Sequence, residues 1–315
     1  MFDPDRFVDE AVKDLKEQIK GKALIACSGG VDSTVCAVLA NRALGDDLYA
    51  LHVNTGLLRK GESEEIKKLF EQLGIKLYYL DESDRFFEAL KGVVDPEEKR
   101  KIIGELFIRI FEEFAERHGI EYLIQGTIAP DWIESGDELR ETIKSHHNVG
   151  GLPENVKLKI VEPLRDLYKD EVRKVARYLN LPISERQPFP GPGLAIRVVG
   201  EVTRERVEIV REACSIVEEE IEKASESGKI KRPWQYFAVL IPVKTVGVHG
   251  DKRAYGYTIA VRAIDSVDAM SGSFSRVPYD VLDRIATRIS NEMGDKVTRV
   301  VYDITNKPPA TIEWE

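Results

Sequence analysis

The sequence has few cysteines and no long hydrophobic run. Its three cysteines, Cys27, Cys36 and Cys214, are odd in number and unclustered, so we expect neither a disulfide framework nor a zinc site. No stretch is long and uncharged enough for a membrane helix. The first residues, MFDPDRFVDEAVKDL, are too acidic for a signal or transit peptide. These absences predict a cytoplasmic chain without membrane contact.

The chain also lacks an excess of positive charge. It has 46 lysines and arginines against 55 aspartates and glutamates, which gives a formal net charge of -9. Because neutralisation of phosphates supplies most of the affinity for nucleic acid, this balance argues against a nucleic-acid partner. It leaves room for a small anion held by a few local cations. With 315 residues, 43% of them hydrophobic and 32% charged, the composition predicts a soluble globular protein of two domains.

Short apolar runs alternate with helical patterns in the first part of the chain. The predicted strands are KALIAC (22–27), LYALHVN (48–54), KLYYLD (76–81) and EYLIQGT (121–127). Strands that alternate with helices in this way predict an α/β fold, a doubly wound parallel sheet with helices on both faces. Ligands of such sheets bind beyond the carboxyl ends of the strands, where the strand order reverses. The turn after the first strand would lie at this edge.

The pattern changes at two places. A polar segment at about 128–160 is too long for a simple connection and predicts a lid. RQPFPGPGLAIR (186–197) contains three prolines and two glycines, which predict a rigid turn near a domain boundary. We therefore expect a first domain at 1–199 and a smaller α+β domain at 200–315. The predicted elements of the second domain are a charged helix at 203–224, strands at 236–243, 256–264 and 299–304, and a helix at 279–291.

The stretch ACSGGVDST (26–34) lies between the first strand and the following helix. Unpaired N–H groups and the helix dipole favour an anion there, and the two glycines would let a polyphosphate approach closely. The three hydroxyls could add donors, and Asp32 could hold a magnesium ion. The alternative is an ordinary turn with Ser33 as N-cap. Neither the Walker loop nor the dinucleotide fingerprint matches. The candidate phosphate residues are Ser28, Gly29, Gly30, Val31, Asp32, Ser33 and Thr34.

The string SGGVDS resembles the signature of the ATP pyrophosphatase (PP-loop) family, whose members release pyrophosphate from ATP and form adenylates. Longer strings resemble the GMP synthetase members of that family and together span nearly the whole chain. They are VNTGLLRKGE, IQGTIAPDWIES, IKSHHNVGGLP, VEPLRDLYKDEVR, PFPGPGLAIR and NKPPATIEWE. One departure is Gln187, where the family has a histidine, so the role of this position stays open.

The resemblance implies that XMP, ATP and ammonia become GMP, AMP and pyrophosphate through an adenyl-XMP intermediate. ATP and Mg²⁺ are the implied cofactors, with Asp32 as the metal ligand. The implied partners are a separate glutamine amidotransferase subunit and a second copy of the chain, joined through the C-terminal domain. None of the three cysteines has the small-residue strand-to-helix setting of a glutaminase nucleophile. No N-terminal stretch is left over for such a domain, so we expect it on another polypeptide.

The resemblance also implies roles for individual residues. The catalytic candidates are Asp32, Asp131, Glu134, Lys144 and Lys169, with Arg165 as a further phosphate contact. The XMP-site candidates are Arg59, Gln235, Arg299, Lys307, Ile312 and Glu313. Arg59 is expected at the end of the second strand, on the binding side of the sheet.

Other interpretations stay open. Each charged candidate taken alone could be a surface residue. The neighbouring His146 and His147 could suggest a metal pair, although adjacent side chains point apart. Within enzymes, the alternative is another adenylating member of the family, such as an NAD synthetase or a tRNA thiolase. A thiolase should show paired catalytic cysteines, which the sequence lacks. Outside enzymes, the alternative is a nucleotide-sensing module that binds ATP without turnover.

Overall fold

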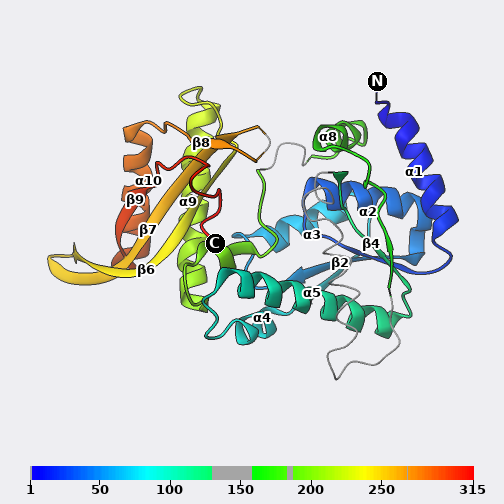
Figure 1. The fold of residues 1–315 in the computed structure, drawn as a ribbon, viewed down its shortest axis with the longest axis horizontal. Coiled ribbons are helices and arrows are strands. Elements are labelled where there is room, and N and C mark those ends of the chain that lie inside the picture. Colours follow the sequence, from blue (N-terminus) through cyan, green and yellow to red (C-terminus); the bar gives the residue numbers. More distant parts are fainter. Residues whose placement is uncertain (1, 130–157, 183–186, 268) are drawn as a thin grey trace. The chain divides into compact units, whose positions relative to one another are not determined.

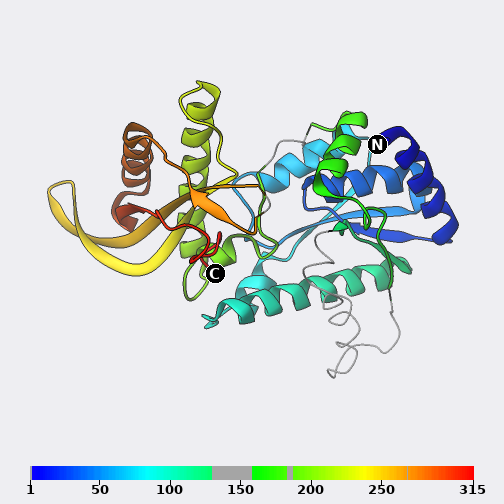
Figure 2. The same ribbon diagram turned by 45° about the horizontal axis from the view of Figure 1, so that its top comes forward.

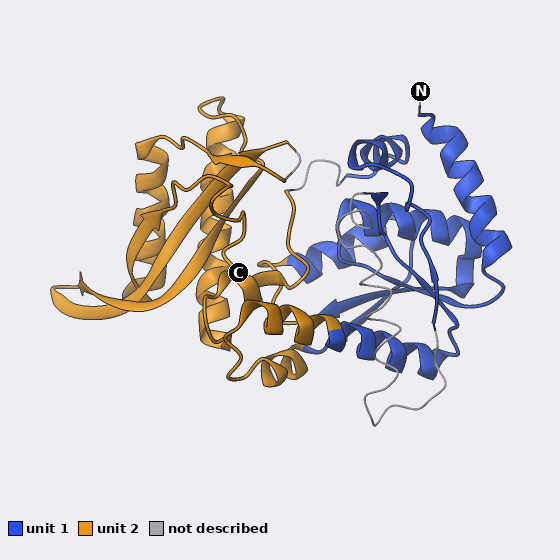
Figure 3. Cartoon of the chain, viewed as in Figure 1, with its two compact units in different colours: residues 1–54, 62–82, 105–186 blue, residues 55–61, 83–104, 187–315 orange. Residues whose placement is uncertain are grey.

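The computed structural model describes residues 2–129, 158–182, 187–267 and 269–315. The chain divides into two compact units (Figure 3). Unit 1 consists of residues 1–54, 62–82 and 105–186, and unit 2 consists of residues 55–61, 83–104 and 187–315. None of the helices in the described ranges has the length and apolar character that crossing a bilayer requires.

Much of the predicted lid lies outside the described residues. So do five of the positions discussed above, namely Asp131, Glu134, Lys144, His146 and His147. The roles predicted for them stay predictions.

Unit 1 is built on a five-stranded parallel sheet with the order β3-β2-β1-β4-β5. The strands are β1 (Ala23–Ala26), β2 (Leu48–Asn54), β3 (Leu77–Asp81), β4 (Tyr122–Ile124) and β5 (Lys159–Val161). The chain runs outward from β1 through β2 to β3 and then crosses back to β4 and β5. The strand order therefore reverses between β1 and β4, which confirms the predicted α/β class and its switch point.

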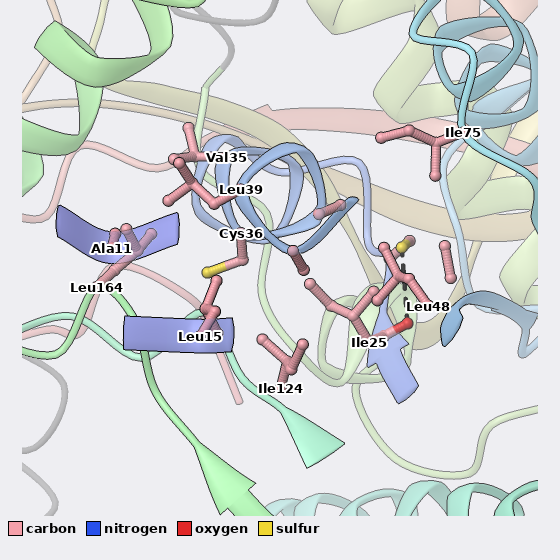
Figure 4. Close-up of a cluster of buried hydrophobic side chains, with 14 of the residues drawn as sticks. Ala11, Leu15, Ile25, Val35, Cys36, Leu39, Leu48, Ile75, Ile124 and Leu164 are labelled. Carbon is pink, nitrogen blue, oxygen red and sulfur yellow. Dashed lines mark hydrogen bonds between the residues drawn. The ribbon is translucent and has the colours of Figure 1, made fainter. Parts of the chain in front are cut away.

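Helices cover both faces of this sheet (Figures 1 and 2). They are α1 (Pro4–Gln18), α2 (Val31–Leu44), α3 (Glu62–Gln72), α5 (Pro96–His118) and α8 (Lys169–Tyr178). Buried side chains of α1, α2, α3 and α8 share one apolar cluster with β1, β2 and β4, in which Leu15, Val35 and Ile124 take part (Figure 4). On the other face Phe114 of α5 packs against Tyr49 and Tyr78. Burial on both faces explains why the strands read as continuous apolar runs.

Unit 2 contains a four-stranded sheet and its helices. The strands are β6 (Gln235–His249), β7 (Lys252–Ser266), β8 (Gly272–Phe274) and β9 (Val297–Tyr302). β7 pairs antiparallel with β6 and β8 and parallel with β9. The helices are α4 (Ser83–Ala89), α9 (Arg204–Glu226) and α10 (Tyr279–Met293), with 3-10 turns at Gly193–Arg197 and Gly294–Lys296. α9 packs against β6, and α10 packs against α9 and β9 (Figure 1).

The three strands predicted in the second part of the chain are present as β6, β7 and β9, but the prediction missed one strand. The described residues contain a fourth, β8, which has only three residues and therefore no readable pattern. The first predicted strand was also too short, because we ended it beside Pro242. β6 continues to His249, and its pairing with β7 shifts register between Ile241 and Lys244, which accommodates the proline within the strand.

Candidate functional site

The turn between β1 and α2 starts from a backbone position that favours glycine. Gly29 has a φ of 74°, a region that side-chain-bearing residues rarely adopt. Gly30 is the N-cap of α2 and makes no side-chain capping bond, so the first N–H groups of the helix are not capped by a side chain. The alternative with Ser33 as N-cap is wrong, because α2 already begins at Val31. Among the described residues, the helix N-terminus at this turn therefore has no capping side chain.

The hydroxyl groups of the turn are held by the turn itself. The Oγ atoms of Ser28 and Ser33 lie 3.0 Å apart, and the Ser33 hydroxyl also donates to the Gly30 carbonyl at 3.2 Å. The buried Thr34 hydroxyl donates to the same carbonyl at 2.8 Å. Ser28 is exposed and Thr34 is not. The serines are therefore better placed than Thr34 to meet a ligand.

The loop that follows β4 approaches this turn closely. A Cβ atom on Gly126 would lie 3.2 Å from the backbone carbon of Asp32 and 3.2 Å from the nitrogen of Ser33. Such contacts are tight, so a larger residue at position 126 would have to displace the phosphate turn. The two loops come from β1 and β4, the strands between which the order reverses. The edge of the sheet at which a ligand is predicted is thus bordered by residues 28–34 and the start of the loop after β4.

Asp32 belongs to the first of these two loops and lies beside a cation from a distant part of the chain. Its Oδ2 atom accepts a hydrogen bond from Lys169 Nζ at 2.6 Å, and Lys169 is the first residue of α8. The other oxygen, Oδ1, is buried and has no hydrogen-bond partner among the described residues. A buried carboxylate oxygen without a donor fits a cation or an incoming donor. Arg165, four residues before Lys169, lies 3.8 Å from Glu162.

The described residues contain no group of three acidic, histidine or cysteine side chains that could hold a metal ion by themselves. A magnesium ion at Asp32 would therefore need oxygens from another source. ATP phosphates supply such oxygens, and Mg²⁺ in nucleotide sites is usually held by one or two carboxylates and the substrate's phosphates. The residues present fit that arrangement through the free Oδ1 atom of Asp32.

Arg59 was predicted to lie at the end of the second strand, and this prediction was wrong. β2 ends at Asn54, and Arg59 belongs to unit 2. Its guanidinium stacks on the Phe189 ring at 4.4 Å and lies 3.5 Å from Glu218. The sequence misled us because VNTGLLRKGE reads continuously, whereas the chain leaves the sheet before Thr55.

Gln187, the position whose role was open, holds three segments of unit 2 together. Its Nε2 donates to Glu218 at 2.9 Å, and its Oε1 accepts from the backbone N–H of Tyr236 at 3.0 Å. Its backbone carbonyl accepts from Arg59 at 3.4 Å. The side chain therefore joins the PFPGPG segment to α9 and to the start of β6.

Two of the predicted XMP-site residues are in contact, namely Glu313 in the segment that follows β9 and Gln235 at the start of β6. Glu313 Oε1 accepts a hydrogen bond from Gln235 Nε2 at 2.9 Å. The same carboxylate forms a bidentate pair with the buried Arg197, with distances of 2.8 and 3.1 Å. Burial alone would lower the pKa of Arg197, but the adjacent Glu313 carboxylate raises it above its ordinary value. Ile312, next in sequence, is buried.

Lys307 is held against β8. Its backbone exchanges hydrogen bonds with Gly272 at 2.8 and 2.9 Å, and its Nζ donates to the Ala269 carbonyl at 2.8 Å. Arg299 lies elsewhere on the sheet. It is exposed and pairs with Thr258 of β7, whereas Gln235 pairs with Ile264. Those two β7 positions are about 20 Å apart at the rise of an extended strand. Arg299 is therefore not part of the cluster around Glu313.

Three fully buried cations of unit 2 were missed from the sequence. They are Lys99, Arg197 and Arg262. Lys99 donates to the Val198 carbonyl at 2.8 Å and to the Glu315 side chain. A signal was present, because Arg197 and Arg262 interrupt the apolar strings GLAIRVV and TIAVRAI. A charged residue in such a run predicts a buried pair, although not which partner it has.

All three cysteines are free and buried. Burial raises the pKa of the Cys27 and Cys214 thiols, and burial followed by the nearby Asp32 carboxylate raises that of Cys36. Because the thiolate is the nucleophilic form, none of the three is suited to attack an amide. This agrees with the prediction that the chain carries no glutaminase cysteine.

Two protein families match parts of the chain. Residues 219–314 match the family described as GMP synthase C terminal domain. Residues 22–95, which include the phosphate turn, match the family described as Queuosine biosynthesis protein QueC. Among solved structures, an NMN synthetase from Francisella tularensis is 19% identical with a TM-score of 0.48, covering 66% of this chain and 85% of its own. That likeness is too slight to carry an argument.

Curated relatives match over the full length, and each is named as one subunit of a glutamine-hydrolyzing GMP synthase. The relative from Pyrococcus horikoshii is 62% identical over 318 aligned positions, which cover 100% of both chains. The relative of the same name from Thermoplasma acidophilum is 58% identical over 309 positions, which cover 98% of each chain. Identity at this level over the whole length shows the family: this chain belongs to the family formed by that subunit of glutamine-hydrolyzing GMP synthase.

Proposed function

We propose that this chain catalyses the ATP-dependent amination of XMP to GMP through an adenyl-XMP intermediate, a ligase reaction of purine biosynthesis that releases AMP and pyrophosphate. The observation that carries the proposal is the phosphate turn, an uncapped helix N-terminus with two glycines and Asp32 at the switch point of the sheet. Relatives 58% and 62% identical are named as GMP synthases, which supports the same reaction. Because its substrates are soluble nucleotides, we expect the reaction in the cytoplasm.

The chemistry assigns different tasks to the two nucleotides. The C2 oxygen of XMP attacks the α-phosphorus of ATP, and pyrophosphate leaves. Ammonia then adds to C2, and AMP departs with that oxygen. The protein must align the attacking oxygen with phosphorus and stabilise the leaving pyrophosphate. A loop that holds pyrophosphate as a leaving unit needs no lysine aimed at a transferred γ-phosphoryl group, which fits the turn seen here.

We assign the pyrophosphate to the first turn of α2. The proposed contacts are the N–H groups of the helix start, the serine hydroxyls and two cations from the β5–α8 region. The full proposed set is Ser28, Gly29, Gly30, Val31, Asp32, Ser33, Thr34, Arg165 and Lys169. Mg²⁺ is proposed at Asp32, where Oδ1 is buried without a donor among the described residues. When bound, the ion would neutralise phosphate charge. For the lid we keep Asp131, Glu134 and Lys144 as proposed catalytic residues.

We assign XMP to the second domain, proposed as residues 200–315. Gln235 and Glu313 support this proposal because the Glu313 carboxylate accepts hydrogen bonds from both Gln235 and the buried Arg197. Ile312, the neighbour of Glu313 in sequence, is buried. The Glu313 carboxylate accepts three hydrogen bonds, so at least one lone-pair position remains for a substrate donor. Lys307, Arg59 and Arg299 stay as proposed contacts. Of these, Arg299 has the weakest support, since it lies far along β7 from Gln235.

Ammonia is proposed to come from a separate glutaminase subunit. The three buried thiols of this chain support the proposal, and it agrees with the name of the relatives, which makes each of them one subunit of a glutamine-hydrolyzing enzyme. The purified chain should make GMP from ammonium salts, increasingly well as the pH rises, because ammonium is not a nucleophile and ammonia is. It should make none from glutamine. Glutamine-dependent GMP formation by this chain alone would overturn the split.

A homodimer is proposed through the second domain. The outer part of the β6–β7 ribbon exposes the apolar side chains of Val243, Val246, Val248 and Tyr255. Val246 and Tyr255 are register partners, so they lie on the same face of the ribbon. A second copy of the chain is the occupant we propose for this face. Sedimentation should give a dimer, and Val248→Lys should weaken it. A monomer at all concentrations would refute this part.

One assay separates the proposed function from its rivals. Pyrophosphate release from ATP should require XMP, and neither a nicotinate-containing acid nor tRNA should replace it. An NAD synthetase or a thiolase would show the opposite preference. A nucleotide sensor would bind ATP and release no pyrophosphate with any member of the panel.

A further inference from the structure

Arg262 of β7 makes an unusual set of contacts for a strand residue. The side chain is fully buried, with 0% of its surface exposed. Within the described ranges, its hydrogen bonds go to a single segment, residues 303–312. Nη1 donates to Asp303 Oδ2 at 2.7 Å and to the Thr305 carbonyl at 3.0 Å. Nη2 donates to the Thr311 carbonyl at 2.7 Å, and Nε donates to the Ile312 carbonyl at 2.8 Å.

These acceptors lie on both limbs of one loop. Asp303 and Thr305 belong to the limb that leaves β9, and Thr311 and Ile312 belong to the limb that returns toward Glu313. The guanidinium thus ties the two limbs together at a fixed separation. Its planar fork sets the directions of the donors, which a flexible ammonium group would not do.

Other bonds of the loop do not replace this tie. The Lys307 backbone pairs with Gly272, and Asn306 Oδ1 accepts from the Phe274 N–H at 3.1 Å. Both bonds hold the tip of the loop against β8. The Ala310 N–H donates to the Asn306 carbonyl at 3.0 Å, which closes the tip upon itself. Among the described contacts, none of these reaches Thr311 or Ile312, so their carbonyls depend on Arg262.

The charge of Arg262 is compensated within the same loop. The Asp303 side chain is 10% exposed and also accepts from Trp314 Nε1 at 3.0 Å and from the Thr305 N–H at 2.9 Å. A buried cation that is paired and donates four hydrogen bonds stabilises one geometry and penalises others. The loop therefore has its shape before any ligand arrives, and a preorganised loop binds without an ordering cost.

We propose that Arg262 is a positioning residue for XMP. It touches no substrate in this scheme. Lys307 is also held by β8, and Glu313 is also held by Arg197 and Gln235. Arg262 fixes the returning limb between these two residues, and so contributes to the affinity for XMP and leaves the affinity for ATP unaffected. The inference rests on the proposed function, because it assumes that this loop contacts XMP.

The test compares Arg262→Lys and Asp303→Asn with the unmodified chain and with Arg288→Lys as control. Arg288 of α10 also pairs with several carboxylates, but these are Glu219, Glu220 and Glu292, outside the loop. The readouts are the KM for XMP and for ATP, the kcat with saturating ammonium, and thermal unfolding. Both loop variants should raise the KM for XMP about tenfold or more, since one lost hydrogen bond to a charged donor exceeds that factor. The KM for ATP should stay within about twofold of the unmodified value, well short of the tenfold change that one such hydrogen bond is worth.

Three outcomes decide the question. A raised KM for XMP alone, absent from Arg288→Lys, supports the positioning role. An unchanged KM for XMP in either folded loop variant overturns it, and so does an equal rise of both KM values that follows the loss of thermal stability. If Arg262→Lys does not fold, Asp303→Asn carries the decision, because it retains an acceptor for the Thr305 N–H. If the unmodified chain showed no XMP-dependent pyrophosphate release, the proposed function itself would fail, whatever the variants do.

Discussion

The substitution Asp32→Asn distinguishes a catalytic role of the Asp32 carboxylate from a structural role. The ion pair with Lys169 is partly exposed, with 24% of the Asp32 side chain and 45% of the Lys169 side chain accessible. Such a pair contributes at most about 1 kcal/mol to the free energy of unfolding. The substitution preserves the size of the side chain but removes the charge of Oδ1, the oxygen that has no described donor. Loss of one preorganised electrostatic contact costs roughly 10²- to 10³-fold in rate, or about 2.7–4 kcal/mol. The effect on rate should therefore exceed the effect on stability several times over.

The assay is XMP-dependent release of pyrophosphate with ammonium as the nitrogen source, alongside a thermal melt. Asp170→Asn is the matched control, since Asp170 lies next to Lys169 on α8 and forms an exposed pair with Lys174 at 3.2 Å. It should leave both measurements nearly unchanged. If Asp32→Asn kept near-normal pyrophosphate release, Asp32 would not be the magnesium ligand. If it lost activity only in proportion to stability, the carboxylate would be structural.

Two further predictions concern the scaffold. Gly193→Ala should lower the free energy of unfolding by more than about 1 kcal/mol, because Gly193 has a φ of 63° and an added Cβ would collide with the Leu57 carbonyl oxygen. Gly191→Ala is the control and should be nearly neutral, because the space around Gly191 is open. Chemical denaturation of both variants measures the difference. Burial lowers the pKa of His52 in the folded chain from its usual 6.5. As the pH falls, the imidazole therefore becomes protonated in the unfolded chain before it does so in the folded chain. The free energy of unfolding should therefore decline as the pH falls below about 6.5 and level off below the folded-state pKa, and His52→Asn should flatten that slope.

The sequence predicted the strands of unit 1 more accurately than it predicted contacts between residues that are far apart in the chain. LYALHVN matches β2 residue for residue, because a strand buried on both faces reads as an apolar run. The turn at residues 28–34 was readable because its conformation depends on consecutive residues, and its phosphate-binding role stays a proposal. Asp32 and Lys169 were each predicted as site residues, but their contact was not predicted, because 137 positions separate them in the sequence. No local pattern carries such a contact.

Other features could not be read for different physical reasons. β8 is defined by pairing with β7 and not by its own three residues. The burial of Arg262 depends on carbonyls some 40 to 50 positions further along, and backbone acceptors leave no mark on the side-chain sequence. Arg59 was misplaced because the end of β2 is set by where pairing with its neighbours stops, at Asn54.

Because all three thiols are buried, their reaction with an external reagent can report local unfolding of this chain. Cys27 and Cys36 belong to unit 1 and Cys214 to unit 2, and all are protected in the folded state. An alkylating reagent can label each one only when its surroundings open, so the labelling rate measures the free energy of that local event. Peptide mapping after timed labelling would then give separate opening equilibria for the two units without any introduced probe. A cysteine introduced at an exposed site would react without any opening step and would give the reference rate for an unprotected thiol.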